Sequence, residues 1–301
     1  GAVAPGAHAA RARPGPARSV GIVARMAPPL CLLTVHAHPD DESSKGAGTV
    51  AKYKAEGVRT VLVCCTGGEE GDILNPAMDK PEVRADLPAV RMAELAKAAE
   101  IIGYDHVELL GYRDSGMPDS EANRNPAAFA NAPFDEAVDR LAAILRRERP
   151  QVVVTYPDEQ QGYPHPDHLR VHDITQPAVE RAADPAWKTD AGEPWQVAKV
   201  YYSVWSKKRT ELVHQKFLEL DLESPYSQEW FDRPWQDHRI TTMIDIEGFA
   251  EVRFDALLAH ATQIDPNSPF WFGLPREVAA SIHPYDDYHL ACSPLEPVPE
   301  S

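Results

Sequence analysis

The sequence predicts an α/β protein built on a Rossmann-like, doubly wound and mainly parallel sheet. Three observations indicate this fold: short apolar runs alternate with segments of helical period, polar clusters follow four of the runs, and the alternation weakens after about residue 205. Strands that alternate with helices pair in parallel, because a parallel crossover needs a connection about as long as a helix. The weaker pattern beyond residue 205 predicts a smaller C-terminal lobe packed over the sheet edge.

Five apolar segments are short and rich in β-branched residues, which is typical of buried strands. They read "LCLLTVHA" (30–37), "RTVLVCCT" (59–66), "HVELLG" (106–111), "QVVVTYP" (151–157) and "AKVYYSVW" (198–205). Further along the chain, "RITTMIDI" (239–246) predicts one more short strand.

Segments of helical period lie between these strands. Helices are predicted over 44–57, 84–102, 133–150, from 165 onward and around 249–263. Within 84–102, Leu95, Ala99 and Ile102 recur at the spacing that puts them on one face of a helix. Gly57 is a predicted helix stop, because glycine readily adopts the left-handed conformation found after helix ends.

The overall composition disfavours two classes of partner. The 301 residues are 43% hydrophobic and 25% charged, and the formal net charge is -16. Binding to nucleic acid or to an anionic membrane needs clustered lysine and arginine, so we expect neither. No apolar run is long enough to cross a bilayer.

The cysteines and the first residues predict a cytoplasmic protein. Cys31, Cys64, Cys65 and Cys292 form no CxxC pair, so we expect buried reduced thiols rather than disulfides. Residues 1–26 are rich in alanine, arginine, proline and glycine and predict a disordered leader. They contain no long apolar segment followed by a cleavage site for secretion. The catalytic domain is predicted over 27–205 and the lobe that completes its pocket over 206–301.

A polar cluster follows each of the first four predicted strands. The clusters are "HAHPDDE" (36–42), "TGGEEGD" (66–72), "GYRDSGMPD" (111–119) and "PDEQQGYPHPDH" (157–168). The carboxyl ends of parallel strands lie at one edge of the sheet, where doubly wound proteins bind their ligands. The sequence therefore predicts an active site at this edge.

Two of these clusters carry histidine–acid pairs suited to a metal ion. His38 and Asp41 are three residues apart beyond one strand, and "HPDH" (165–168) lies beyond another. Two imidazole nitrogens and one carboxylate leave a position open for water, which is the pattern of a catalytic zinc site. Asp40, beside a ligand, is then placed to act as general base on that water. The same set suits other divalent ions, including iron(II).

Both motifs also have a purely structural explanation. Proline fixes φ in a His-Pro-Asp turn, in which the aspartate accepts backbone N–H groups. The three acids Asp40, Asp41 and Glu42 would also suit the positive N-terminus of a following helix. Finding both motifs at strand ends of one sheet favours the metal site.

Two further histidines are interpreted as supporting residues. His168 and His172 share a helix face, but the glutamate of an HExxH metal site is missing between them, so His172 is predicted to be packed or to support a ligand. His36 would face the same way as His38 on a regular strand, and a structural role is predicted for it.

With these residues in view, "AHPDDE" (37–42) and "HPDH" (165–168) together resemble the LmbE-like, or PIG-L, family of zinc-dependent N-deacetylases. Members of this family hydrolyse an amide on a glucosamine-type sugar. The resemblance extends over residues 30 to 290 and implies that His38, Asp41 and His168 are the metal ligands. It also implies that Asp40 is the general base.

The resemblance assigns roles to three more residues of the second motif. It implies that Tyr163 donates a hydrogen bond to the developing oxyanion. His165 would stabilise that intermediate or protonate the leaving amine. Asp167 would orient a neighbouring imidazole.

Other stretches resemble the amidases of this family that act on mycothiol S-conjugates. They are "VHAHPDDESSKGA", "TGGEEGDILNPAMD", "GYPHPDH", "DAGEPW", "KVYY" and "LAHATQIDPNS". This implies a small-molecule thiol–sugar conjugate as partner and cleavage of the amide between glucosaminyl-inositol and an S-conjugated N-acetylcysteine. The products would be a mercapturic acid and glucosaminyl-inositol, and the biological role would be detoxification. The oligomeric state is not defined by the sequence.

The resemblance also suggests which residues bind the substrate. Glu69, Arg91 and Asp114 are candidates for the sugar and inositol hydroxyls, and Lys45 for the cysteinyl end. The alternatives are an exposed helix cation for Arg91 and a solvated lysine for Lys45.

Two departures from the amidase pattern keep other functions open. Glu70 stands where a basic residue is expected, and "YPDEQQ" (156–161) replaces an Asn-Gly-Gly run. The alternatives are an N-acetylglucosaminyl-inositol deacetylase and an amidase of secondary metabolism that acts on a related thiol–sugar conjugate. A sugar-binding module that is not an enzyme is a third alternative.

Overall fold

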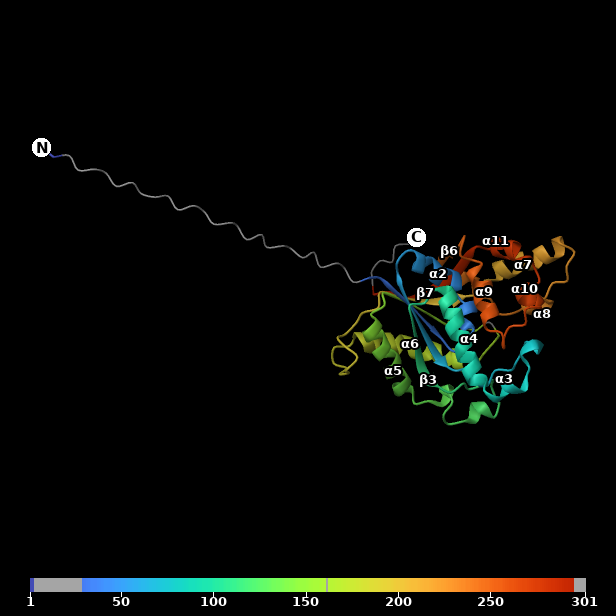
Figure 1. The fold of residues 1–301 in the computed structure, drawn as a ribbon, viewed down its shortest axis with the longest axis horizontal. Helices are drawn as coiled ribbons and strands as arrows, with labels where there is room; N and C mark the ends of the chain where they lie inside the picture. Colours follow the sequence, from blue (N-terminus) through green and yellow to red (C-terminus); the bar gives the residue numbers. More distant parts are fainter. Residues whose placement is uncertain (3–28, 161, 295–301) are drawn as a thin grey trace.

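The observed sheet confirms the predicted fold class. The computed structural model describes residues 1–2, 29–160 and 162–294. Within them a seven-stranded sheet has the order β3-β2-β1-β4-β5-β7-β6, and helices cover both of its faces (Figure 1). The strands are β1 (Cys31–His36), β2 (Arg59–Thr66), β3 (His106–Tyr112), β4 (Val152–Thr155), β5 (Lys199–Val204), β6 (Thr242–Asp245) and β7 (Tyr285–Cys292). The first five strands pair in parallel, whereas β7 is antiparallel to both β5 and β6.

Helices connect most of the strands. The α-helices of the described residues are α1 (Asp41–Ser44), α2 (Ala47–Ala55), α3 (Pro81–Ala85), α4 (Leu87–Ile102), α5 (Phe134–Glu148), α6 (Pro166–Ala183), α7 (Lys207–Glu219), α8 (Gln228–Phe231), α9 (Val252–Ala259), α10 (Pro269–Phe272) and α11 (Arg276–Ile282). Short 3₁₀ turns are formed by Pro76–Met78, Ala122–Arg124, Phe129–Asn131 and Asp237–Arg239.

The alternating side chains of β1 explain the two helical layers. Cys31, Leu33 and Val35 belong to a core cluster that includes residues of α5 and α6. Leu32 belongs to a second cluster, with residues of α2, α4 and α9. Because successive side chains of a strand point to opposite faces, a strand that is buried at every position must be covered on both sides.

Two helices differ in the structure from their predicted bounds: one begins later and one is divided in two. The helix predicted from residue 44 begins only at Ala47, after Gly46 with its positive φ of 92°. The helix predicted over 84–102 is divided at Asp86 into α3 and α4. Pro88 lies in the first turn of α4, and it lacks the N–H that would continue the helical hydrogen bonds from the preceding turn.

The sequence pattern does not predict β7, because its first half carries two acidic residues that are rare in strands. The structure gives both of them hydrogen-bond partners. The backbone N–H and the hydroxyl of Thr49 donate to Oδ2 of Asp286, at 3.0 and 2.8 Å. The hydroxyl of Ser206 donates to Oδ2 of Asp287 at 2.6 Å. These partners offset the cost of burying carboxylates in a strand.

The chain after residue 205 continues the same sheet through β6 and β7 and adds the helices α7 to α11. The division into a domain over 27–205 and a lobe over 206–301 stays a prediction. The predicted leader over 1–26 lies almost entirely outside the described residues, as does the end of the chain from 295.

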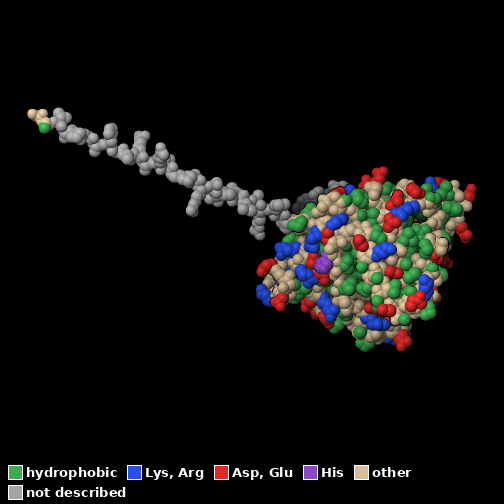
Figure 2. Space-filling view, in the orientation of Figure 1, with side chains coloured by type: hydrophobic (Ala, Val, Ile, Leu, Met, Phe, Trp, Pro, Cys, Tyr) green, Lys and Arg blue, Asp and Glu red, His purple; other side chains and the backbone are tan. Residues whose placement is uncertain are grey.

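Three of the four cysteines agree with the expectation of buried thiols. No helix among the described residues is long and apolar enough to cross a membrane. Cys31, Cys64 and Cys65 are buried free thiols, and Cys292 is a partly exposed one. Figure 2 shows acidic and basic side chains interspersed over one face of the molecule.

Candidate metal centre and active site

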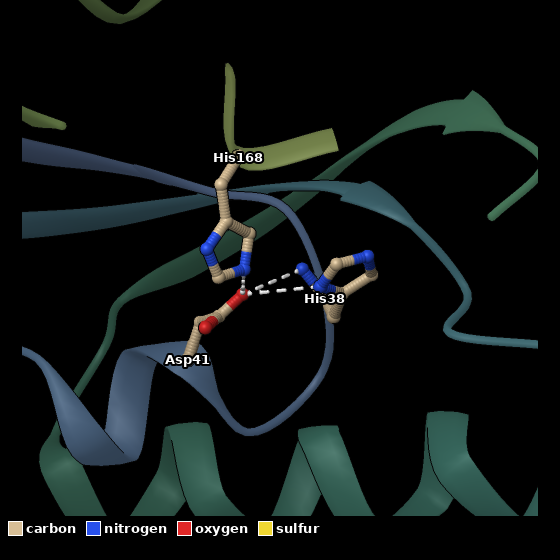
Figure 3. Close-up of side chains that lie close together, drawn as sticks. All are labelled: His38, Asp41 and His168. Carbon is tan, nitrogen blue, oxygen red and sulfur yellow. Dashed lines mark hydrogen bonds and ion pairs between the residues drawn. The ribbon is translucent and has the colours of Figure 1, made fainter. Parts of the chain in front are cut away.

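His38 and Asp41 meet across the tight turn that follows β1. Between β1 and α1, Asp40 adopts a positive φ of 112°, a conformation that residues other than glycine rarely adopt. The Nδ1 atom of His38 lies 3.4 Å from Oδ2 of Asp41. The backbone N–H of His38 donates to the same oxygen at 3.0 Å. The turn therefore directs both side chains to one point (Figure 3).

His168 joins this pair from a segment more than a hundred residues away. It lies in the first turn of α6, the helix that begins at Pro166 beyond β4. Its Nε2 atom is 3.3 Å from Oδ2 of Asp41. A dashed line marks this contact in Figure 3. His38, Asp41 and His168 are all buried, and each offers a ligand atom within 4.8 Å of the other two. We call these three residues the ligand cluster.

The spacing within the ligand cluster fits a divalent cation. Two ligands bound to a tetrahedral zinc ion at about 2.0–2.1 Å lie about 3.4 Å apart. The separations observed from Oδ2 of Asp41 to the two imidazole nitrogens are 3.4 and 3.3 Å. Two nitrogens and one oxygen leave a coordination position open, and the same donor set suits iron(II).

Asp167 holds the imidazole ring of His38. Its Oδ2 lies 3.1 Å from Nε2 of His38 and also accepts the backbone N–H of Ser115 at 2.9 Å. The hydroxyl of Ser115 donates to the other carboxylate oxygen. A carboxylate bound to one ring nitrogen keeps the proton on that side, which leaves Nδ1 for a cation. This geometry supports the orienting role predicted for Asp167.

The two imidazoles of the ligand cluster have opposite pKa shifts. Burial opposes a charge on His38, yet its pKa lies well above the usual value. The cause is hydrogen bonding to three carboxylates, those of Asp114, Asp167 and Asp41. Burial lowers the pKa of His168 to about 4, against the attraction of Asp41. At neutral pH His168 therefore offers a free nitrogen, whereas His38 must release a proton before it binds a cation.

Arg91 holds Asp40 beside the ligand cluster. One guanidinium nitrogen of Arg91 lies 3.3 Å from Oδ2 of Asp40 and donates to the carbonyl of Pro39 at 2.6 Å. The other donates to the carbonyl of Gly68. Arg91 is only 2% exposed, so the alternative of an exposed helix cation is wrong. Burial raises the pKa of Asp40 to about 6, although Arg91 opposes this rise, so Asp40 is ionised at neutral pH but more basic than an ordinary aspartate.

His165 and Tyr163 lie next to the ligand cluster. Nδ1 of His165 accepts the backbone N–H of Asp167 at 3.2 Å. Burial and the nearby His38 lower the pKa of His165, so its neutral ring carries the proton on Nε2. Tyr163 is 49% exposed, and its ring centroid lies 6.0 Å from that of His165.

A cavity of about 680 Å³ opens over the ligand cluster. Besides the cluster it is lined by most of the predicted site residues, namely Asp40, Lys45, Arg91, Asp114, Tyr163 and His165. Residues from both sides of position 205 contribute to its walls. The structure thus brings nearly all predicted site residues to one cavity.

Lys45 is paired within the protein. Its Nζ lies 2.6 Å from Oδ1 of Asp41, the oxygen that faces away from the two imidazoles. The ammonium group is thus paired with a carboxylate, while the Lys45 side chain stays 26% exposed. Because Lys45 also lines the cavity, its predicted contact with the cysteinyl end stays a prediction.

Of the two neighbouring acids Glu69 and Glu70, the predicted substrate-binding residue Glu69 does not belong to the described lining of the cavity, whereas Glu70 does. The carboxylate of Glu69 accepts the backbone N–H of Asp114 at 2.9 Å, and Glu69 is absent from the described lining of the cavity. Glu69 would therefore affect substrate binding only by holding the backbone of Asp114 in position. Glu70 does line the cavity, where it forms an ion pair with Arg113.

The two supporting histidines lie outside the ligand cluster, as predicted. Nδ1 of His172 is 3.1 Å from the carbonyl oxygen of Tyr156, and its ring packs against Tyr202. His36 is buried, and its ring contacts the edge of Tyr156. Neither ring nitrogen of His36 has a hydrogen-bond partner among the described residues, and burial lowers its pKa to about 4.

A buried pair behind the ligand cluster, Glu42 and His260, is missed by the sequence reasoning. Both side chains are 0% exposed, and His260 Nε2 lies 2.7 Å from Oε1 of Glu42. The other oxygen of Glu42 accepts the backbone N–H of Asp40 at 3.0 Å. The pair thereby supports the strained turn at Asp40. The only signal in the sequence is the "LAHATQ" stretch, which indicates no partner for His260 by itself.

The fold and the site together define a class: a doubly wound α/β protein with a candidate divalent-metal site at the carboxyl edge of its sheet. Residues 33–179 match the family model "PIG-L: GlcNAc-PI de-N-acetylase". The chain is 43% identical to a mycothiol S-conjugate amidase of Streptomyces coelicolor, over 89% of this chain and 93% of that protein. It is 42% identical to a 1D-myo-inositol 2-acetamido-2-deoxy-alpha-D-glucopyranoside deacetylase of Streptomyces scabiei, over 86% and 84%.

Among solved structures, the fold is similar to that of the N,N'-diacetylchitobiose deacetylase from Pyrococcus horikoshii. The TM-score is 0.60 at 19% identity, and the match covers 86% of this chain and 83% of that one. The chain belongs to the PIG-L, or LmbE-like, family. The family resemblance of the two histidine motifs is thereby confirmed.

Replacing His168 with alanine should lower the affinity for Zn²⁺ by more than about 100-fold, because even residues that only orient ligands contribute about 10- to 100-fold. Competition with a chromophoric chelator measures this affinity. His172→Ala is the matched control, since His172 lies one turn further along α6 and bonds to the Tyr156 carbonyl. Equal affinities of His168→Ala and the wild type would contradict the ligand assignment.

Zinc affinity should rise with pH because His38 must lose a proton to bind. Its raised pKa means that the cluster is protonated below that pKa, where the apparent affinity falls about tenfold per pH unit for one displaced proton. His168, with a pKa of about 4, adds no such dependence near neutrality. Calorimetry in buffers of different ionisation enthalpy counts the released proton. An affinity that is constant between about pH 6 and about pH 8 would refute this account.

Removing His260 should destabilise the fold, because it leaves the Glu42 carboxylate buried without its partner. His260→Ala should lower the free energy of unfolding by about 3–5 kcal/mol. Glu42→Gln should cost less, since an amide still bonds to a neutral imidazole. Urea denaturation with the metal chelated measures both. A cost below about 1 kcal/mol for His260→Ala would show that the pair contributes little.

The stability that the Glu42–His260 pair provides should fall both at acidic pH and at alkaline pH. The pKa of Glu42 is lowered, so its contribution is present above the ordinary value of 4.5 and lost as the pH falls. The pKa of His260 is raised, so its contribution is present below the ordinary value of 6.5 and lost as the pH rises through the raised one. The difference between wild type and His260→Ala should therefore be largest between those two values.

Proposed function

We propose that this protein is a cytoplasmic, metal-dependent amidase that hydrolyses mycothiol S-conjugates in a detoxification reaction. The bond cleaved is the amide between the glucosamine nitrogen and the carbonyl of an S-conjugated N-acetylcysteine. The products are a mercapturic acid and glucosaminyl-inositol. A small-molecule thiol–sugar conjugate is thus the partner, and zinc is the favoured metal, with iron(II) as the alternative.

One observation carries this proposal: the three ligand atoms lie within 4.8 Å of one another in a large cavity, and the Asp41 oxygen is 3.4 and 3.3 Å from the two imidazole nitrogens. His38, Asp41 and His168 would hold the ion. A divalent cation bound there polarises the amide carbonyl and lowers the pKa of water to about 7. A sugar-binding module that had lost catalysis would have no need to keep this buried set of donors together.

Asp40 supplies the base. Its carboxylate is ionised at neutral pH, and its pKa of about 6 makes it a better proton acceptor than an ordinary aspartate. It would take one proton from the attacking water as the oxygen bonds to the carbonyl carbon. Arg91 fixes the position of the carboxylate through the contact at 3.3 Å, which limits the loss of orientation in the transition state.

Tyr163 and His165 would act on the other atoms of the amide. The hydroxyl of Tyr163 donates to the carbonyl oxygen as negative charge develops, a contribution of about 2.7–4 kcal/mol where such donors have been removed. The Nε2–H of His165 would stabilise the same oxygen or protonate the leaving amine as the C–N bond breaks. Asp114 and Glu70 line the same part of the cavity and would accept hydrogen bonds from sugar and inositol hydroxyls.

Deacetylation of N-acetylglucosaminyl-inositol is the second candidate. It is favoured by the 42% identity to the deacetylase of Streptomyces scabiei, nearly equal to the 43% identity to the amidase. The two reactions share the sugar amine and differ only in the acyl group. The same ligand cluster and the same base would therefore serve both.

The metal-loaded protein should hydrolyse a bimane conjugate of mycothiol faster than it deacetylates N-acetylglucosaminyl-inositol. Chromatography of the fluorescent mercapturic acid and release of acetate measure the two rates on one sample. Asp40→Ala should bind a full equivalent of Zn²⁺ but lose turnover by about 10²- to 10⁴-fold, since it removes the general base and no ligand.

Two outcomes would contradict this proposal. Faster release of acetate than of the mercapturic acid would favour the deacetylase. Near-wild-type turnover by Asp40→Ala, with metal bound, would remove Asp40 from the mechanism.

A further inference from the structure

The cavity over the ligand cluster extends to a set of aromatic side chains. Trp205 follows β5 directly, Trp230 lies on α8, and Phe270 and Trp271 lie on α10. All four line the same cavity as the ligand cluster, and all are partly exposed. We call these four side chains the aromatic wall.

The rings of the aromatic wall hold one another in place. The ring centroids of Phe270 and Trp271 are 4.6 Å apart at 87°, and those of Trp230 and Phe270 are 5.4 Å apart at 56°. Trp205 is nearly parallel to Phe270, with centroids 6.1 Å apart at 20°. Such contacts fix ring orientations, so the wall is a preformed surface.

Two arginine side chains also restrict the orientation of the rings in the aromatic wall. The guanidinium of Arg209 lies 5.0 Å from the ring centroid of Trp205, and that of Arg233 lies 3.6 Å from that of Trp230. Both arginines also line the cavity. Cation–π contacts of this kind hold the flat guanidinium against the ring, which limits rearrangement of the wall when a ligand enters.

The strand order places the aromatic wall opposite the polar part of the cavity. β1 and β4 are adjacent in the middle of the sheet, and the segments after them carry the ligand cluster. β2 and β3 lie on one side of this pair, and the segments after them bring Glu70 and Asp114 to the cavity. β5 lies on the other side and leads into Trp205. An amide held at the ligand cluster would therefore direct its two substituents toward different walls.

We propose that the aromatic wall is the binding site for the S-linked substituent on the acyl side of the substrate, and that it selects large aromatic substituents. This inference rests on the proposed function. Sugar and inositol hydroxyls need hydrogen-bond acceptors, which the polar part of the cavity offers through Glu70 and Asp114. Aromatic faces instead suit a flat apolar group, because ring pairs gain from stacking as well as from burial.

Three substrates that share glucosaminyl-inositol test this inference on the metal-loaded, full-length protein. Their acyl groups are acetyl, S-methyl-N-acetylcysteinyl and S-bimane-N-acetylcysteinyl. For the wild type, kcat/KM of the bimane conjugate should exceed that of the methyl conjugate at least about tenfold. In Trp271→Ala and Trp230→Ala this preference should fall to near one.

Matched variants separate binding from folding. Trp187→Ala removes a tryptophan that is also stacked on an arginine, Arg146, but lies outside the described lining of the cavity, so it should keep the wild-type preference. If Trp271→Ala does not fold, as judged by zinc content, Trp271→Phe and Trp271→Leu provide the comparison. The phenylalanine variant should keep more of the preference than the leucine variant.

The outcomes distinguish this inference from the proposed function. A preference unchanged in the tryptophan variants would show that the wall does not contact the substituent. An equal loss on all three substrates would show that the wall binds the sugar instead, which also overturns the inference. No hydrolysis of either conjugate by the zinc-loaded wild type would overturn the proposed function, and the inference with it.

Discussion

Buried carboxylates are the constraint on which this end of the molecule depends. Asp41, Glu42, Asp114 and Asp167 are each at most 3% exposed, and a buried carboxylate without a partner would neutralise or unfold the site. Their partners come from four different segments: the turn after β1, the loop after β3, the start of α6 and the end of α9. Satisfying these acids therefore requires the segments to meet. When these segments meet they form the ligand cluster, and the same contacts offset the cost of burying the four carboxylates.

A divalent cation would fit this arrangement. The carboxylates around His38 favour a proton on that ring and raise its pKa. A cation bound there would replace this proton and add a further positive charge next to Asp41, whose other oxygen is already paired with Lys45. The Glu42–His260 pair would not take part in this replacement of a proton by a cation, and it supports the turn at Asp40. The groups that would bind the cation are thus different from those that hold the backbone.

A feature of the fold or the site can be predicted from the sequence when the residues that define it are close together in the chain. The strands β1 to β5 and the residues of the ligand cluster are predictable, because apolar runs and the two histidine motifs are contiguous in the chain. The partners of Glu69 and Glu42 are not, since Asp114 and His260 lie 45 and 218 residues away. The strand β7 is missed for a similar reason: its acids become acceptable in a strand only through Thr49 and Ser206. For Arg91 the sequence leaves open a substrate contact or an exposed helix cation, and only the structure shows the carbonyl groups of Pro39 and Gly68 beside its guanidinium.

The same reasoning explains why overall similarity does not decide between the two candidate reactions. The residues proposed to bind the cation and to move protons lie at the ends of the central strands, and both reactions would need them. The residues that distinguish an acetyl group from a conjugated cysteine must instead lie where the acyl group projects, on the side of β5. There the wall is built from short segments after residue 204, whose sequence shows neither strand nor clear helical period. Near-equal identities of 43% and 42% average over the whole chain and give these few side chains little weight. Under our proposals, the aromatic wall would therefore set the specificity of this protein, and the residues at the strand ends would perform the chemistry.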